Sequence, residues 1–338
     1  MQLERFDPAS DPRRVRACHA MYLAGAPQDS PAEPAMSDRA FAGLLGYGWT
    51  EDRPQPWLAT DGAGEPVGWY LMIAPERENT RLASVLLLVA PGRRRAGLGT
   101  ALVRHAADQA AGQGRTVLAT DAREDSAAAA FWRALGAEPG IVEVVRVLRL
   151  ASADAGQLAE LRAHAGQAAR GYPLLSWTGP VPEQQLAGYA ALGEAMNDAP
   201  RDAGHEGQRW DAERVRRSEQ RVAAQGLRFY TVAATDGRGE LAAVTQLGVD
   251  PLQPDWGFQE LTAVARQHRG HRLGLLVKLA MLELLAEREP QLTAIITGNA
   301  DANKHMIAIN EQLGFTELDR WRSWDLSVDC ALALPARP

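Results

Sequence analysis

The sequence predicts an α/β protein built from two similar halves in tandem, and three observations support this prediction. At 338 residues the chain is too long for one ordinary hydrophobic core and fits two domains of about 150 residues each. Strand-like and helix-like segments follow one another in the same order in both halves. A basic turn between a strand and a helix occurs once in each half, and residues 86–99 align with residues 261–274 without a gap.

The first half begins with a short apolar strand and two helices, and continues with strands separated by turns. The Gly-Ala-Gly sequence at residues 62–64 separates two strands in the manner of a hairpin. An apolar run then ends at the basic turn, where a helix begins. The expected strands are residues 3–6, 57–60, 67–73, 82–89, 116–120 and 142–150, and the expected helices are residues 12–23, 37–45, 98–111 and 126–135.

The second half repeats this order, with a corresponding hairpin at residues 236–239. The polar, alanine-rich stretch 151–171 is expected to be a helical junction, so we predict domains at residues 1–151 and 152–338. The expected strands are residues 172–177, 229–234, 241–249, 260–264 and 292–297, and the expected helices are residues 183–196, 211–224, 273–286 and 303–313. One apolar face of the third helix, typical of a helix that covers a sheet, comprises Leu273, Leu276, Val277, Ala280 and Leu284.

Composition indicates a soluble globular protein, with 46% hydrophobic and 23% charged residues. No apolar run approaches the roughly 18 residues of a membrane span, and no signal-peptide pattern begins the chain, so we predict a cytoplasmic protein without membrane contact. Cys18 and Cys330 fit neither a disulfide framework nor a metal site. The formal net charge of -6 argues against general nucleic-acid binding.

Each basic turn has the features of a pocket for a phosphate or pyrophosphate. Backbone N–H groups at a helix N-terminus, neighbouring arginines and a glycine without a side chain all favour an anion there. A dinucleotide site is an alternative, because Asp121 follows Gly97 and Gly99 at about the distance of a ribose-binding acid. The third glycine of that motif would fall at Leu102, and neither turn has the lysine of a nucleotide-triphosphate loop. A turn that only packs strand against helix is the remaining alternative.

Residues 94–99 and 269–274 resemble the [Q/R]-x-x-G-x-[G/A] signature of the GNAT N-acetyltransferase superfamily. The first turn matches every position, and the second departs from it at Arg272, where the first glycine belongs. Each half also has a later helix that ends in Leu-Gly, at residues 135–136 and 313–314. The tandem arrangement is similar to that of the two-domain mycothiol synthases, which implies a catalytic C-terminal half and a degenerate N-terminal half.

The resemblance implies two tandem GNAT-like domains, each a mixed, splayed β-sheet flanked by helices. It also implies acetyl-CoA, or another acyl-CoA, as co-substrate, with no metal. The Arg272 side chain would occupy space that glycine leaves open, although its guanidinium could bond a phosphate directly. The cofactor-binding residues implied are Val89, Ala90, Arg94, Arg95, Ala96, Gly97, Leu98, Gly99 and Thr100 in the first half, and Val264, Ala265, Arg269, Gly270, His271, Arg272, Leu273, Gly274 and Asn303 in the second.

Acylation of an amine needs a base that removes its proton, and Glu260 is the candidate. It lies four residues before Val264, and period-two alternation predicts that it shares a strand face with Thr262 and Val264. The aligned residue of the first half is Val85, which cannot take a proton. This difference favours the second half as the catalytic one, while the first could still bind acyl-CoA. A solvated or salt-bridged strand-end carboxylate is the alternative for Glu260.

Many members of the superfamily have a tyrosine in the Leu-Gly helix that protonates the leaving thiolate, and Trp132 and Asn310 hold that position here. Asn310 can donate an amide hydrogen bond to the thiolate, or it can serve the helix surface or a cap. Asn303 fits an N-cap as well as a cofactor contact. The superfamily's acceptor site usually includes the segment between the first two helices, which here contains Asn197, Asp198 and His205. A polar turn before a proline explains that segment equally well.

Taken together, these residues predict an acyl-CoA-dependent N-acetyltransferase. The expected reaction is direct transfer of an acetyl group to a primary amine of a small molecule. One alternative is a non-catalytic acyl-CoA sensor or scaffold, since both halves lack the tyrosine, and another is a protein or peptide N-acetyltransferase. The histidines lack metal-ligand spacing. The expected partner is a small-molecule amine, and the chain is expected to be a monomer or a homodimer.

Overall fold

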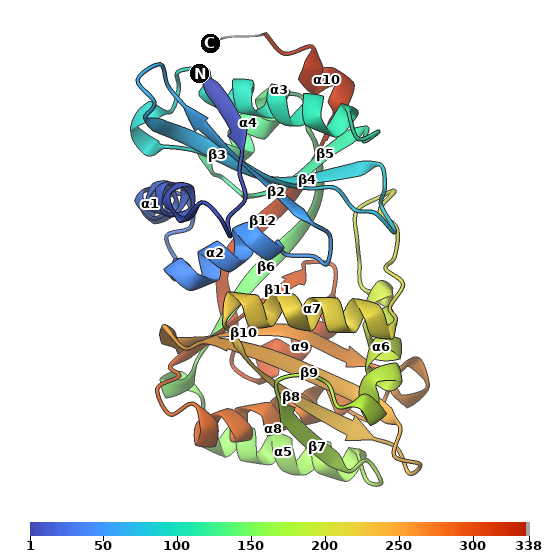
Figure 1. Ribbon diagram of the computed structural model, residues 1–338. Helices are drawn as coiled ribbons and strands as arrows, with labels where there is room; N and C mark the ends of the chain where they lie inside the picture. The colour runs from blue at the N-terminus through green and yellow to red at the C-terminus, as the bar shows by residue number, and fades with distance from the viewer. Residues whose placement is uncertain (336–338) are drawn as a thin grey trace. The chain divides into compact units, whose positions relative to one another are not determined.

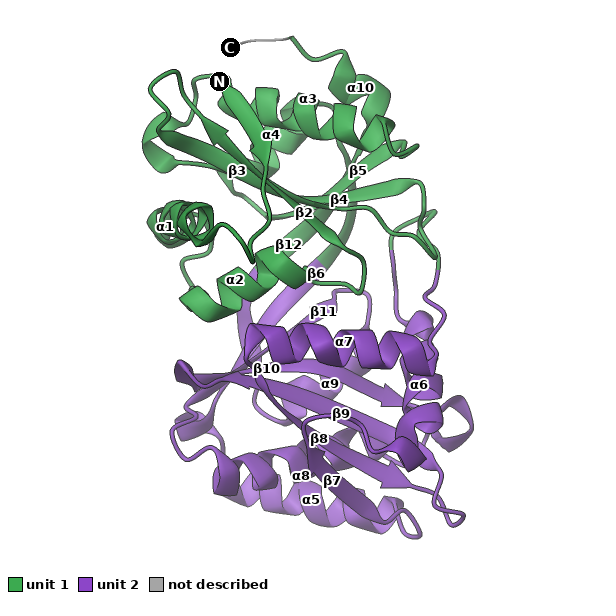
Figure 2. Ribbon diagram, in the orientation of Figure 1, with its two compact units in different colours: residues 1–142, 202–206, 320–338 green, residues 143–201, 207–319 purple. Residues whose placement is uncertain are grey.

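The computed structural model describes residues 1–335, which form two compact units (Figure 2). The first unit comprises residues 1–142, residues 202–206 and the described part of residues 320–338. The second comprises residues 143–201 and 207–319. The units therefore differ from the single boundary at residues 151 and 152 that the sequence predicts.

The first unit is a mixed sheet with the strand order β1-β2-β3-β4-β5-β12, and its only parallel pair is β4 with β5. Its strands are β1 (Gln2–Arg5), β2 (Pro54–Thr60), β3 (Pro66–Ile73), β4 (Leu82–Val89), β5 (Val117–Arg123) and β12 (Thr316–Ser327). Its helices are α1 (Pro12–Asp29), α2 (Asp38–Tyr47), α3 (Leu98–Ala111), α4 (Ala127–Ala134) and α10 (Val328–Leu332) (Figure 1).

Alternating side chains of β3 divide the core of the first unit into two layers. Trp69 and Leu71 pack against α1 and α2, whereas Tyr70 and Met72 pack against α3 on the other face. The strand is buried on both sides, so helices cover both faces of the sheet.

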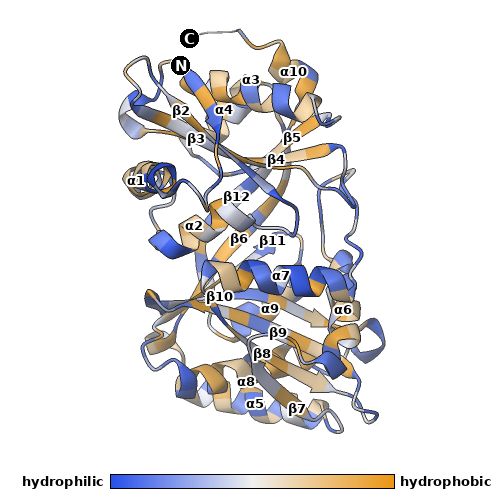
Figure 3. Ribbon diagram, viewed as in Figure 1, coloured by the Kyte–Doolittle hydropathy of each residue, from blue (hydrophilic) through white to orange (hydrophobic). Residues whose placement is uncertain are grey.

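The second unit has the strand order β6-β11-β10-β9-β8-β7, and its only parallel pair is β10 with β11. Its strands are β6 (Glu138–Arg149), β7 (Leu174–Thr178), β8 (Arg228–Thr235), β9 (Leu241–Asp250), β10 (Gln253–Val264) and β11 (Ala294–Ala300). Its helices are α5 (Ala155–Ala168), α6 (Leu186–Ala195), α7 (Ala212–Gln225), α8 (Leu273–Arg288) and α9 (Lys304–Gln312). Helices α5, α8 and α9 pack on one face of the sheet, and α6 and α7 on the other (Figure 1). The strands are largely hydrophobic, whereas α7 is mostly hydrophilic (Figure 3).

Strand exchange explains why the units differ from the predicted halves. Residues 321–327 of β12, at the C-terminal end, pair with β5 of the first unit. Residues 143–149 of β6 pair with β11 of the second unit. No strand is predicted over residues 316–327, because Arg320, Arg322 and Asp325 interrupt the alternation of apolar residues. Pairing over such a long sequence separation leaves no local pattern from which a boundary could be predicted.

The predicted helical junction is present as α5, which packs into the second unit. Within residues 1–335, no helix combines the length and the apolar character that a membrane crossing requires. Cys18 and Cys330 are free thiols, and burial raises the pKa of Cys18 to about 12.

Candidate functional site

Each unit has a splayed pair of parallel strands. In the second unit, β10 pairs with β11 only over residues 256–258 and 294–296. In the first, β4 pairs with β5 only over residues 82–84 and 117–119. The rest of β4 and β10 therefore leaves the parallel ladder before the basic turn is reached. This confirms the splayed sheet that the sequence resemblance implies.

The hydrogen bonds to the antiparallel neighbours show which backbone N–H groups face the splay. The Ala265 N–H donates to the Ala242 carbonyl at 2.9 Å, so alternation turns the N–H of Val264 toward the β11 side. In the first unit the Ala90 N–H likewise donates to Val67 at 3.0 Å. Val89 and Ala90, and likewise Val264 and Ala265, are predicted cofactor contacts, but Ala90 and Ala265 have their N–H groups engaged in the sheet.

The two basic turns have the same backbone conformation, but glycine and arginine exchange places in it. Positive φ angles occur at Arg95 (66°) and Gly97 (83°) in the first turn, and at Gly270 (87°) and Arg272 (55°) in the second. Arginine and glycine thus occupy the two left-handed positions in reversed order. Arg272 adopts the conformation of Gly97 and remains exposed, so its side chain does not prevent the turn.

The turn of the second unit fits a phosphate group. The first intrahelical bond of α8 joins the Leu276 N–H to the Arg272 carbonyl at 3.0 Å, so the N–H groups of residues 273–275 have no partner within the helix. A Cβ atom added at Gly270 would meet no atom within 4 Å, which leaves space beside these donors. Leu273 is buried, and a Cβ at Gly274 would lie 3.4 Å from Ile309, so these two residues offer backbone only.

Carboxylates of the protein engage the arginines of both turns. In the second unit, Asp198 of the 3-10 helix at Met196–Asp198 accepts hydrogen bonds from Arg266 and, at 2.6 Å, from Arg269. These bonds hold the pKa of Asp198 far below its usual range. In the first unit, Asp29 accepts two bonds from Arg94 at 2.6 and 2.9 Å. Asp198, expected beside the acceptor, therefore contacts the arginines of the basic turn.

The other two residues expected at the acceptor site lie in different units. Asn197 closes its own loop, because its side chain exchanges hydrogen bonds of 2.6 and 2.8 Å with the backbone of Gln208. His205 belongs to the first unit, where its Nε2 lies 3.2 Å from Asp325 on β12. The three residues expected at one acceptor site therefore belong to two units, with Asn197 and Asp198 in the second and His205 in the first.

An aromatic cluster that was not predicted from the sequence lies beside the turn of the second unit. The Tyr172 hydroxyl is 3.1 Å from Nδ1 of His268, and its ring centroid is 5.3 Å from that of His271. Among residues 1–335, no three His, Cys, Asp or Glu side chains are grouped so as to hold a metal ion.

The two units differ at the position of the candidate base, because the strand of the second unit has a β-bulge there and the strand of the first does not. In the second unit, Gln259 pairs with Leu247 and Thr262 with Thr245, so residues 260 and 261 oppose a single residue of β9. The first unit has no bulge here, because β3 and β4 keep one register from Gly68–Val89 to Ile73–Ser84.

The bulge corrects the predicted orientation of Glu260. Leu261 and Ala263 pack on the side of α6 and α7, whereas Val264 packs on the side of α8. Glu260 acts electrostatically on residues of α6 and α7, so it does not share the face of Thr262 and Val264. The extra residue interrupts the period-two alternation on which the prediction relied.

The pKa of Glu260 is shifted by its surroundings. Its side chain is exposed to solvent, yet desolvation by the surrounding protein raises the pKa of its carboxyl, and Arg221 of α7 opposes this effect. Tyr189 of α6 is buried, and its pKa is raised by burial, by Glu219 and by Glu260. Tyr189 therefore remains a neutral phenol. The sequence carries no motif that would have identified it.

The two asparagines of α9 have structural contacts. Asn303 is the N-cap of the helix, and its side chain accepts a bond from the Met306 N–H at 3.3 Å. Asn310 is fully buried, and its Nδ2 donates to Asn299 of β11 at 2.7 Å. Its Nδ2 thus ties α9 to β11 inside the unit, and the predicted hydrogen bond from Asn310 to a thiolate stays a prediction.

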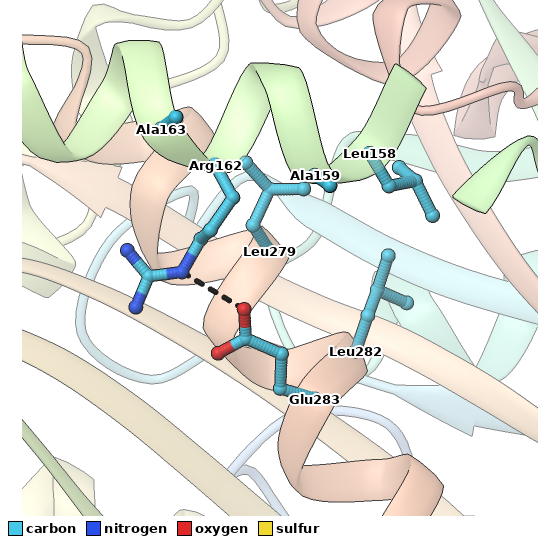
Figure 4. A pocket seen from close by; sticks show the side chains of 7 residues that line it. All are labelled: Leu158, Ala159, Arg162, Ala163, Leu279, Leu282 and Glu283. Carbon is cyan, nitrogen blue, oxygen red and sulfur yellow. Dashed lines mark hydrogen bonds and ion pairs between the residues drawn. The ribbon is translucent and has the colours of Figure 1, made fainter. Parts of the chain in front are cut away.

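A shallow cavity of about 410 Å³ lies between α5 and α8, and it contains none of the predicted site residues (Figure 4). Its two charged residues satisfy each other, since Arg162 donates to Glu283 at 2.9 Å. The residues that line it are Leu158, Ala159, Arg162, Ala163, Leu279, Leu282 and Glu283.

Residues 18–137 match the profile of the acetyltransferase (GNAT) family. This segment includes the first basic turn and the first Leu-Gly helix. The first half of the chain therefore carries a GNAT domain. A comparison with curated proteins found no match.

Solved structures resemble the chain over nearly its whole length. A tandem GNAT protein from the clavulanic acid biosynthesis pathway is 28% identical, with a TM-score of 0.81 and coverage of 97% of this chain and 98% of that chain. A GCN5-related N-acetyltransferase from Sphaerobacter thermophilus is 16% identical, with a TM-score of 0.63 and coverage of 97% and 95%. A GCN5-related glucosamine N-acetyltransferase region of a fungal multi-domain GH3 β-N-acetylglucosaminidase is 15% identical, with a TM-score of 0.67 and coverage of 96% and 38%.

These comparisons confirm the resemblance to the GNAT superfamily in its tandem form. The chain has the tandem GNAT fold, with a mixed, splayed sheet in each unit. Family and fold together support an acyl-CoA-dependent acyltransferase of the acetyltransferase type.

Proposed function

We propose that the protein transfers an acetyl group from acetyl-CoA directly to a primary amine of a small molecule, and that the second unit is catalytic. One observation carries this proposal. The bulge in β10 presents Glu260 four residues before Val264, whose N–H faces the splay. The first unit has neither the bulge nor a carboxylate, because its aligned residue is the buried Val85.

The residues of the second unit have complementary roles in this proposal. When bound, acetyl-CoA supplies an activated acyl thioester. Glu260 takes the proton of the substrate ammonium, and a raised carboxyl pKa suits a base that works near neutral pH. The Val264 N–H is oriented to hydrogen-bond the acyl carbonyl oxygen, where negative charge develops. The backbone N–H groups of residues 273–275 are the donors available to the pyrophosphate.

The charges around Glu260 support an amine as the acceptor. Glu219 and Glu260 both raise the pKa of Tyr189, so two carboxylates lie near this phenol, and a carboxylate can pair with an ammonium group. The similarity to a tandem GNAT protein from the clavulanic acid biosynthesis pathway supports a small molecule. A cytoplasmic location is part of the proposal, because the reaction consumes acyl-CoA.

The first unit is proposed to bind acyl-CoA without turnover. The family profile matches this half, and its turn keeps both glycines of the signature. Its arginines, however, are held by Asp29 and Asp61, which compete with a phosphate for them.

Release of thiol from acetyl-CoA, measured with a panel of small amines and short peptides, tests this function. We expect turnover with a small amine, a loss of about 10²- to 10⁴-fold in kcat for Glu260→Gln, and retained turnover for Arg94→Ala. Loss of turnover in Arg94→Ala alone would assign the chemistry to the first unit. Acetyl-CoA binding without thiol release for any acceptor would instead support a sensor or scaffold, and release with peptides only would support a peptide N-acetyltransferase.

A further inference from the structure

Lys278 is an unusual residue in this chain. Of its 36 basic residues only Lys278 and Lys304 are lysines, and the others are arginines. Lys278 lies on α8 and is 3% exposed. A lysine can lose its proton when buried, whereas an arginine cannot, and burial lowers the pKa of Lys278 to about 7. Unlike an arginine, Lys278 can therefore serve as a neutral donor in this core.

The partner of Lys278 is Gln259, the residue directly before the bulge. The Lys278 amine donates to Oε1 of Gln259 at 3.4 Å and lies 5.4 Å from the centre of the Phe315 ring. The side-chain amide of Gln259 donates to the Gln246 carbonyl at 2.6 Å and to the Thr245 hydroxyl at 3.0 Å. Gln259 therefore uses its donors to hold β9 at the bulge, while Lys278 holds its acceptor.

The first unit lacks this whole arrangement. The residues aligned with Gln259 and Lys278 are Ser84 and Val103. Val103 is fully buried in an apolar core, and β4 runs past β3 without a bulge. The buried amine, the glutamine and the bulge thus occur together in one unit and are absent together from the other.

We propose that Lys278 is a positioning residue for acyl transfer: its amine holds Gln259 directly before the bulge of β10, and the bulge turns Glu260 toward α6 and α7. The structural part of the proposal is that Lys278 holds Gln259 at the bulge, and it depends on the Lys278–Gln259 contact alone. The catalytic part rests on the function proposed above.

Hydrogen exchange of the full-length protein tests the structural part. We expect Lys278→Met to accelerate exchange in peptides that cover residues 259–262 by about tenfold, the effect of losing one hydrogen bond. Lys304→Met, at the other lysine, should leave these peptides unchanged. Leu285→Ala, a buried change on the same helix, should loosen the unit generally without a selective effect at the bulge. Equal exchange at residues 259–262 in Lys278→Met and Lys304→Met would overturn the proposal.

Kinetics test the catalytic part, with a double-mutant cycle between Lys278 and Gln259. We expect Lys278→Met and Gln259→Met each to lower kcat at least about tenfold with an unchanged KM for acetyl-CoA, and the double variant to lose no more than either single one. Multiplied losses in the double variant would refute the coupling. If Lys278→Met does not fold, Gln259→Met alone must show a lowered kcat with an unchanged KM for acetyl-CoA, and faster hydrogen exchange at residues 259–262. If the wild type has no turnover, the proposed function fails, while hydrogen exchange still decides whether Lys278 holds the bulge.

Discussion

Replacement of Glu289 by glutamine is predicted to destabilise the second unit strongly. Glu289 follows the C-terminal end of α8 and is 5% exposed. It accepts hydrogen bonds from Arg228 at 2.8 and 2.7 Å and from the Tyr230 hydroxyl at 2.6 Å. Desolvation alone would raise the pKa of Glu289, but these bonds lower it overall, so the carboxylate is ionised and its partners depend on it.

The size of the effect follows from what each partner loses. Breaking a buried ion pair by removing one charge costs about 3–5 kcal/mol. Arg228 is 40% exposed and can be hydrated again, so the lower end of that range, about 3 kcal/mol, applies. Because the pKa of Glu289 is lowered on folding, its stabilising contribution is present above the unfolded pKa and is lost as the pH falls through the folded value.

Hydrogen exchange of α8 peptides at increasing urea concentration measures this free energy for the second unit alone. The matched control is Glu283→Gln, which removes the same charge from a 58% exposed residue on the same helix and should cost less than about 1 kcal/mol. Equal destabilisation by the two substitutions, or a Glu289→Gln effect that does not shrink in acid, would refute the reasoning.

Three further predictions concern the turn, the base and the loop at residues 202–206. Arg272→Gly should raise the unfolding free energy of the second unit by about 1 kcal/mol in urea titrations, because Arg272 is in the left-handed region. Since folding raises the pKa of Glu260, its ionisation costs stability as the pH rises, and Glu260→Gln should increase Tm at pH 8 more than at pH 4. His205 has its pKa raised by Asp325, so this pair stabilises below about pH 6.5 and the stabilisation is lost as the pH rises through the folded pKa. Exchange at residues 202–206 should therefore accelerate above that range in the wild type but not in His205→Gln.

Local sequence determined the helices, most of the strands and the conformation of the basic turns. Residues 98–111 were predicted as a helix and form α3, because apolar periodicity and the preceding glycine are properties of neighbouring residues. The same holds for the turn at residues 269–274, whose positive φ angles need glycine or a tolerant residue at set positions. Asn303 was identified as a helix cap for the same reason.

Only the tertiary structure decided how these parts meet. The pairing of β12 with β5, the bond between Asp198 and Arg269, and the burial of Asn310 join residues distant in sequence, which no local pattern specifies. The basis of the bulge at Glu260 is equally non-local, because it depends on Gln259 reaching β9 and on Lys278 reaching Gln259 from α8. The sequence identified Glu260 as the candidate base because a carboxylate occupies that position on the strand before the basic turn. The direction in which its side chain points depends instead on strand register, which packing and hydrogen bonds across the sheet determine.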